Sequence, residues 1–407
     1  MSKKINRRTA IVAAGVTGVG LAVGAAALEM SQHSSSQVQA SNDTVPFYDT
    51  HQAGIVTPAQ NHLHFAAFDL LTEQYSDVRS LMQIWTSAAA TMTNGHPIGE
   101  GAFPSHAPPP DTGEALNLQA ANLTITFGFG PTLFTLNGKD RYGLASRRPA
   151  PLIDIPPMAG DALQTERSGG DLCVQACSDN PQVAFHAVRN LARLARGLAV
   201  MRWSQLGFNR TASTSQTQET PRNLMGFKDG TNNLKAEDKA SMDQHVWVSS
   251  TDTPSWMRNG TYLVVRRIRM HLEAWDRDFL SDQENVIGRH KVSGAPLNKQ
   301  NEFDPIDLTV LPTNAHVRLA RGDNSIKILR RGYSFTDGMD TQTGELDAGL
   351  FFIAFQRDSR TQFVPLQHRL ASDDALNEYI THVGSAIFAC PPGTHSAGFI
   401  GETLFNL

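Results

Sequence analysis

The feature that most limits the fold of this chain is the repeated change between strand-like and helix-like hydrophobic patterns. In Asn122–Gly130 (NLTITFGFG) apolar residues alternate with threonine and glycine, which is the period of a strand with one buried face. In Asn180–Ala199 apolar residues recur every three or four positions behind an Asn-Pro pair that suits a helix start. Hydrophobic side chains make up 40% of the 407 residues, enough for a large core. A chain with both periods must pack helices against sheets.

Similar segments occur in both halves of the chain. The patterns predict helices at Leu81–Met92 and Asp373–Gly384, and further strands at Asp171–Asn180, Tyr262–Leu272 and Gly349–Asp358. We therefore expect an α+β chain made of two similar antiparallel-sheet halves, residues 41–215 and 216–407. The stretch Trp203–Asn259 is long, polar and rich in Gly, Pro and Asn, so we expect a functional loop there.

Residues 1–40 have the layout of an export signal. Four basic residues within positions 3–8 precede the apolar run Ile11–Leu28, and a polar stretch then leads to the small-residue site Val38–Ala40. The Arg7-Arg8 pair and the mild, glycine-rich hydrophobicity favour the twin-arginine route, and a membrane anchor is the alternative. Because that route exports folded chains, an exported enzyme that receives its cofactor in the cytoplasm is a hypothesis from this segment alone.

Charge and cysteine content exclude other classes. The formal net charge is -4 and no basic face is indicated, so we expect no nucleic-acid partner. The three cysteines, Cys173, Cys177 and Cys390, cannot form a complete disulfide framework because their number is odd. A Cys173–Cys177 bond would be short, and buried free thiols are the expected state.

Three segments carry candidate chemistry. They are GFKDGTNN with Asp229, PTNAHVRLARGDN with His316, and KILRRGYSF with Arg330 and Arg331. Each has an ordinary structural explanation when taken alone. An Asp beside Gly often makes a turn, and a single histidine is often a hydrogen-bonded structural side chain. A pair of arginines at the end of a strand often lies at an edge that is exposed to solvent.

Together and in this order, the three segments resemble the dye-decolorising (DyP-type) heme peroxidases, and most closely their exported, iron-uptake-associated branch, called deferrochelatase/peroxidase. The family signature GxxDG is matched by Gly226, Asp229 and Gly230. The resemblance covers nearly all of the chain after residue 40 and includes HQAGIVTPAQ, LTITFGFGPTLF, VIGRHKVSGAPL and LDAGLFFIAFQRD. It implies a pair of ferredoxin-like halves and one heme b per chain.

The resemblance also implies roles for individual residues. His316 resembles the proximal iron ligand, Asp229 the distal acid/base, and Arg330 the distal arginine, with Arg331 as the alternative. Gly230, Thr231 and Asn232 fall where the family's loop touches the heme. Arg321 falls near a heme propionate, but Ala320–Ser325 is shorter than the matching segment in many relatives, so this register stays open.

The chemistry of a peroxidase fits these residue types. A small base must take a proton from one oxygen of hydrogen peroxide and return it to the other, beside a fixed cation. Asp229 on a glycine-flanked loop suits the base, and the arginine fork suits the cation. On the other face, the second nitrogen of His316 needs a hydrogen-bond acceptor, for which Asp347 and Glu345 are candidates. Bulky donors could be oxidised through aromatic side chains: Trp203, Tyr262, Trp275 and Tyr333.

The sequence therefore predicts a heme peroxidase that reduces hydrogen peroxide and oxidises small organic donors, such as dyes or porphyrinogens. Two alternatives stay open: a deferrochelatase that releases iron from heme, and a non-catalytic exported heme-binding accessory of iron uptake. The resemblance further implies a homo-oligomer, most simply a dimer, with components of an iron-uptake permease as possible partners. The export signal implies the periplasm, the cell surface or the extracellular space.

Overall fold

The computed structural model describes residues 43–99, 105–341 and 343–406, so the predicted export signal lies outside the described residues. The strands are β1 (His62–Leu70), β2 (Thr124–Phe129), β3 (Thr135–Leu136), β4 (Lys139–Asp140), β5 (Leu172–Ser178), β6 (Ala199–Arg210), β7 (Thr261–Met270), β8 (Leu329–Arg330), β9 (Tyr333–Met339), β10 (Leu346–Gln356) and β11 (Ile380–Cys390). The α-helices are α1 (Tyr75–Thr93), α2 (Pro131–Phe134), α3 (Pro181–Leu194), α4 (Lys239–His245), α5 (Leu272–Trp275), α6 (Leu280–Ile287), α7 (His316–Arg321), α8 (Phe363–Asp373) and α9 (Glu402–Phe405). Short 3₁₀ helices are η1 (Ala145–Arg147), η2 (Thr165–Arg167), η3 (Ser255–Met257) and η4 (Ala375–Glu378).

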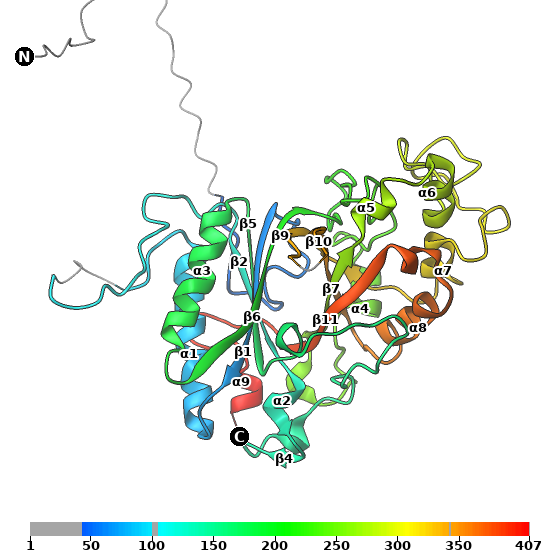
Figure 1. The fold of residues 1–407 in the computed structure, drawn as a ribbon. Coiled ribbons are helices and arrows are strands. Elements are labelled where there is room, and N and C mark those ends of the chain that lie inside the picture. The colour runs from blue at the N-terminus through cyan, green and yellow to red at the C-terminus, as the bar shows by residue number, and fades with distance from the viewer. Residues whose placement is uncertain (1–42, 100–104, 342, 407) are drawn as a thin grey trace, which may run out of the picture. The chain divides into compact units, whose positions relative to one another are not determined.

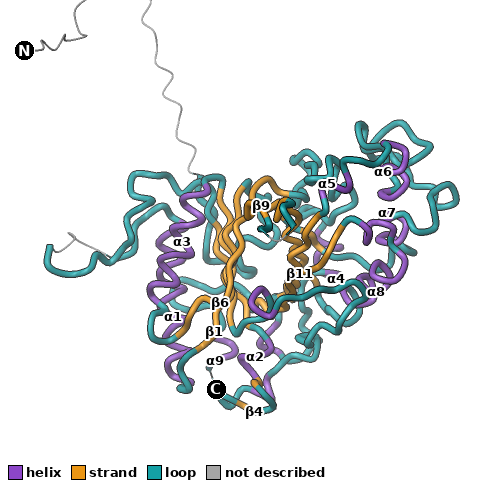
Figure 2. Tube along the Cα trace, in the orientation of Figure 1, coloured by secondary structure: helices purple, strands orange, loops and turns teal. Residues whose placement is uncertain are grey.

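The main sheet closes on itself. Its nine strands follow the order β7-β11-β2-β5-β1-β6-β9-β10-β8, and β7 also pairs with β10, so every strand of this sheet except β8 belongs to one ring. All its pairings are antiparallel, and Figure 2 shows the strands gathered at the centre of the molecule. Closure satisfies backbone groups that an open edge would expose. The α+β prediction is confirmed, whereas the proposed boundary between residues 215 and 216 stays a prediction.

The pleat of the strands divides the hydrophobic residues between the ring interior and the outer helices. Inside the ring, Phe65 of β1 meets Phe351 and Phe388 at ring-centroid distances of 5.3 and 6.0 Å. On the other face of β1, Phe68 packs against Trp85 of α1 at 5.2 Å. Helices α1 and α3 lie together on this outer face, and α6, α7 and α8 lie on the opposite side of the strands (Figure 1).

Helix α3 forms for the reasons that its sequence indicates. The Asn180 side chain accepts a hydrogen bond from the Gln182 backbone N–H at 2.9 Å, and Pro181 occupies the first turn. Val188 and Leu191 are buried on its inner face. Over the described ranges, no helix is both long and apolar enough to cross a bilayer.

The cysteines behave as expected for buried thiols. Cys173, Cys177 and Cys390 are free and lie inside the ring. Cys173 and Cys390 flank Gly128 of β2, where an added Cβ would lie 2.8 and 3.2 Å from their sulfur atoms. Burial raises the pKa of Cys173 and of Cys177.

Two predictions need correction, one at the start of a predicted loop and one for a predicted helix. The stretch expected to be a loop from Trp203 begins in strand β6, which runs to Arg210 and pairs with β1 and β9. Residues 373–384, expected to be a helix, contain η4 and the start of β11. Strand β11 pairs with β7 along its length, so sheet closure outweighs the helical pattern of this short segment. The helix of this region is α8, which precedes it.

Candidate active site

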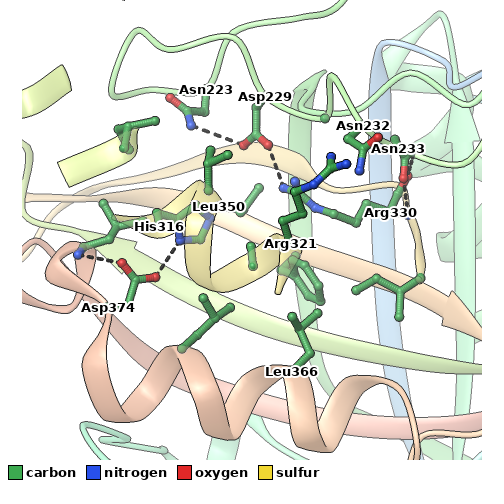
Figure 3. A pocket seen from close by; sticks show the side chains of 18 of the residues that line it. Asn223, Asp229, Asn232, Asn233, His316, Arg321, Arg330, Leu350, Leu366 and Asp374 are labelled. Carbon is green, nitrogen blue, oxygen red and sulfur yellow. Dashed lines mark hydrogen bonds and ion pairs between the residues drawn. The ribbon is translucent and has the colours of Figure 1, made fainter. Parts of the chain in front are cut away.

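A cavity of about 260 Å³ lies in the second half of the chain and collects the candidate residues. Strands β7 and β10, helices α7 and α8, and the loop after Asn223 contribute its walls. Its apolar lining includes Met225, Phe227, Ile268, Met270, Leu350, Phe352, Leu366 and Leu370. Figure 3 shows Asn223, Asp229 and Arg330 as one connected row, with His316 and Asp374 apart from it.

The loop that carries Asp229 is closed on itself. The backbone N–H of Asp229 donates to the Pro221 carbonyl at 2.9 Å, and that of Asn223 donates to the Phe227 carbonyl at 3.0 Å. Gly226 and Gly230 have φ angles of +84° and +81°, a region that favours glycine. A Cβ at Gly230 would also lie 3.0 Å from the Ala212 backbone. The glycines are thus required by the turn and by close packing within the protein itself.

Both oxygens of the Asp229 carboxylate are held by donors. Arg330 Nη2 lies 2.8 Å from Oδ1, and Asn223 Nδ2 donates to Oδ2 at 3.2 Å. The amide of Asn223 has a fixed orientation, because its Oδ1 accepts from the backbone N–H groups of Met225 and Phe227. The sequence analysis missed Asn223, and the only signal for it was its position at the start of the loop that returns to Asp229.

Only one of the two neighbouring arginines faces the cavity. Arg330 is tied in place by Asn233, whose side chain bonds both its backbone N–H and its carbonyl at 2.8 Å. Arg331 is completely buried on the opposite side and donates to the Thr57 carbonyl and to Gln60. Successive residues of an extended chain point to opposite faces. The expectation that Arg331 contacts a cofactor is therefore wrong, and Arg330 is the arginine beside the candidate acid.

His316 is the first residue of α7, and its imidazole faces the cavity. Its Nδ1 lies 2.6 Å from Oδ2 of Asp374, while Oδ1 of Asp374 accepts from the Leu376 backbone N–H at 2.9 Å. Burial alone would lower the pKa of His316, but the charge of Asp374 and its hydrogen bond outweigh burial and raise that pKa. No hydrogen bond joins Nε2 to a residue in the described part of the chain.

The two carboxylates that the sequence analysis named as partners of His316 are engaged elsewhere. Asp347 pairs with Arg267 at 2.9 Å, and Glu345 pairs with Arg269 at 3.3 Å. Both predictions are wrong, because the partner is Asp374 at the end of α8, 58 residues after His316. The sequence analysis missed Asp374 because it did not predict the helix that precedes this residue.

The remaining predicted contact residues line the same cavity. Gly230, Thr231 and Asn232 contribute its loop wall, and Arg321, the last residue of α7, extends into it (Figure 3). The Thr231 hydroxyl donates to Oε1 of Glu302 at 3.0 Å, so its hydrogen bond points into the protein.

The residues of this cavity fit a heme group. Its walls are largely apolar, one free imidazole nitrogen faces it, and Arg321 supplies a cation for an acidic substituent. Within the described ranges, no group of three or more His, Cys, Asp or Glu side chains is arranged to hold a bare metal ion. A single imidazole suits an iron that brings four ring nitrogens of its own.

The aromatic residues considered for electron transfer are mostly core residues. Tyr262, Trp275 and Tyr333 are buried, and Trp203 is half-buried. Trp275 packs against Phe227, which lines the cavity, with 5.8 Å between ring centroids. These contacts are explained by packing alone.

Comparisons with known proteins match most of the chain. Residues 52–209 match the model of the N-terminal region of Dyp-type peroxidases, and residues 220–395 match that of the C-terminal region. The chain is 36% identical over 382 residues to the deferrochelatases of Escherichia coli K12 and Shigella boydii, covering 90% of this chain and 89% of each relative.

Solved structures extend the similarity to three dimensions. Ferric DtpA from Streptomyces lividans is 38% identical with a TM-score of 0.81, and the match covers 89% of this chain and 97% of that one. A DyP-type peroxidase from Cellulomonas bogoriensis is 37% identical with a TM-score of 0.79, covering 90% of this chain and 99% of that one.

Proposed function

This chain belongs to the Dyp-type peroxidase family and is a heme-dependent peroxidase, and from that premise we propose that Asp229, Arg330 and His316 carry its chemistry. The observation that supports the proposal is that one cavity is lined by the Asp229–Arg330 pair and by an imidazole with a free nitrogen. The substrates are hydrogen peroxide and organic electron donors.

His316 holds the iron through Nε2. Asp374 accepts the Nδ1–H, which fixes the tautomer that leaves Nε2 unprotonated and makes it a stronger ligand. When bound, the heme would supply the two electrons that reduce hydrogen peroxide and would regain them from the organic donors.

Asp229 moves the proton. Its carboxylate would take a proton from one peroxide oxygen and deliver it to the other, which would leave as water with the electron pair of the broken O–O bond. Arg330, 2.8 Å from Asp229 Oδ1, stabilises the negative charge that develops on the departing oxygen. Asn223 keeps the carboxylate oriented for both transfers.

The loop residues Gly230, Thr231 and Asn232 contact the heme in this proposal, and Arg321 pairs with one of its carboxylate groups. Each of them lines the cavity, which supports the assignment. Arg331 has no part in it, because its guanidinium is bonded on the far side of the chain.

Replacing Asp229 by Asn tests the proposal. The variant keeps the carboxylate's shape and should still bind heme, but its reaction with hydrogen peroxide should slow by about 10²-fold or more. Heme titration and stopped-flow absorption measure the two properties. A variant that binds heme and reacts with hydrogen peroxide at the wild-type rate would refute Asp229 as the acid/base. If the protein only carries heme, the substitution should change neither heme binding nor any other property.

A second candidate function is the release of iron from heme, because relatives that are 36% identical carry the name deferrochelatase. That reaction needs proton delivery to the pyrrole nitrogens. Incubating the heme-loaded protein without peroxide and measuring the fluorescence of metal-free porphyrin decides it, since no emission means no release.

The layout of residues 1–40 supports export by the twin-arginine route to the periplasm or cell surface. A homodimer, and contact with permease components of iron uptake, complete the proposal. Light scattering of the purified chain tests the dimer.

A further inference from the structure

We propose that Glu302 is a positioning residue for Asp229. Its carboxylate bonds side chains on both sides of the acid/base in the sequence and thereby fixes the position of the Asp229 carboxylate. The inference rests on the proposed function of Asp229. Glu302 lies in a separate segment, between α6 and α7, and the inference makes the peroxide reaction depend on this residue.

Glu302 holds the two residues that flank the Asp229–Gly230 pair. One carboxylate oxygen forms an ion pair with Lys228, and the other accepts from the Thr231 hydroxyl at 3.0 Å. Glu302 is only 9% exposed. Burial alone would raise its pKa, but the hydrogen bonds from Lys228, Thr220 and Thr231 lower it, so the carboxylate stays charged and bonded.

Glu302 is itself anchored to the protein. Arg289, a buried side chain that lines the cavity, donates to the Glu302 carbonyl at 2.9 Å and to the Gly294 carbonyl at 2.6 Å. The segment at Gly294 also packs on Lys228, since a Cβ there would lie 2.6 Å from the lysine side chain. The backbone from which the carboxylate extends is therefore tied to a second loop that touches the same lysine.

Glu302 adds a restraint from outside the Asp229 loop. Within the loop, the backbone is held by the bond from the Asp229 N–H to the Pro221 carbonyl, between two glycines with left-handed φ angles. The tip of Asp229 is held by Arg330 and Asn223, but those contacts do not fix the backbone that carries it. A displacement of about 1 Å of a reacting group can cost on the order of 10²-fold in rate.

The variant Glu302→Gln removes the charge and keeps the shape. We expect the second-order rate of the heme-loaded protein with hydrogen peroxide to fall at least about tenfold. Heme affinity should stay within about twofold of the wild-type value, and the Soret band should not shift, because His316 and Asp374 are unchanged. Glu284→Gln is the matched control, since that carboxylate bonds His290 and the Lys291 backbone but neither Lys228 nor Thr231.

The Thr231 contact gives a second test if Glu302→Gln fails to fold. Thr231→Val removes the hydroxyl and should slow the peroxide reaction, while Thr231→Ser, which keeps the donor, should restore it. Equal peroxide rates for the two variants would overturn the proposed role of the Thr231–Glu302 hydrogen bond.

Two further measurements separate positioning from general damage. In an Asp229→Asn background, Glu302→Gln should have no additional effect on the peroxide rate. In heme-free protein, amide hydrogen exchange over residues 226–232 should accelerate in Glu302→Gln. Equal slowing in both backgrounds, or unchanged exchange, overturns the inference. A wild-type rate for Asp229→Asn alone would instead overturn the proposed function, a different result.

Discussion

Replacing Asp374 by Asn should weaken heme binding by a mechanism that the structure specifies. Asp374 is buried, with 2% of its side chain exposed, and its two oxygens have different partners. Oδ1 accepts from the Leu376 backbone N–H, and Oδ2 faces His316 Nδ1 at 2.6 Å. In the Asn variant the amide oxygen keeps the Leu376 bond, because only it can accept. The amide NH₂ must then face His316.

That arrangement selects the wrong tautomer of the imidazole. With a donor opposite it, Nδ1 of His316 becomes the acceptor and the proton moves to Nε2, the atom that we propose binds iron. Loss of a partner of a metal-bound histidine typically lowers metal affinity 10- to 100-fold, or about 1.4–2.8 kcal/mol. Because this variant also fixes the wrong tautomer, we expect the upper end of that range.

The assay is titration of heme-free protein with heme, followed at the Soret band. Asp373→Asn is the matched control, because that neighbouring carboxylate is exposed. A circular dichroism melt of the heme-free variant shows whether the fold is retained. Wild-type heme affinity and an unchanged Soret band in Asp374→Asn would refute the reasoning about His316.

Three further predictions concern charge, backbone and pH. Arg330→Lys should slow the peroxide reaction at least about tenfold in stopped-flow experiments, since an ammonium cannot reproduce the guanidinium fork beside Asp229; an unchanged rate would exclude a role for the fork. Gly230→Ala should destabilise the protein by about 2 kcal/mol or more in urea unfolding, because a Cβ there meets left-handed strain and a backbone neighbour at 3.0 Å, whereas Gly143→Ala has the strain with open space and should cost about 1 kcal/mol. Burial lowers the pKa of His64 to about 4, so between pH 6.5 and 4 the unfolded state binds more protons than the folded state. The free energy of unfolding therefore falls as pH falls, by up to about 3 kcal/mol. In denaturant titrations His64→Gln should reduce this pH dependence, and an identical pH dependence would contradict the assignment.

Local patterns predicted much of the fold. Alternating residues identified the strand at Thr124–Phe129, and the Asn-Pro start with its apolar stripe identified α3. The same logic failed at Asp373–Gly384, where the predicted helix is replaced by η4 and the start of β11, which pairs with β7. A local period reports which face of a segment is apolar, but it contains no information about a partner that arrives from far along the chain.

The sequence by itself determined the chemical elements of the site. The resemblance was based on a glycine-flanked Asp, a later His and a closing arginine pair, and all four positions are readable without coordinates. Motifs of this kind are compact because the backbone conformations they need are local, as the two positive-φ glycines around Asp229 demonstrate.

Tertiary structure decided how these elements are held. Strand geometry directed Arg330 into the cavity and Arg331 away from it. Packing brought Asp374 to His316 and Glu302 to the Asp229 loop, from segments whose own sequences give no sign of the contact. Such pairings depend on which distant segments meet when the chain folds, and polar groups that are buried there are hydrogen-bonded.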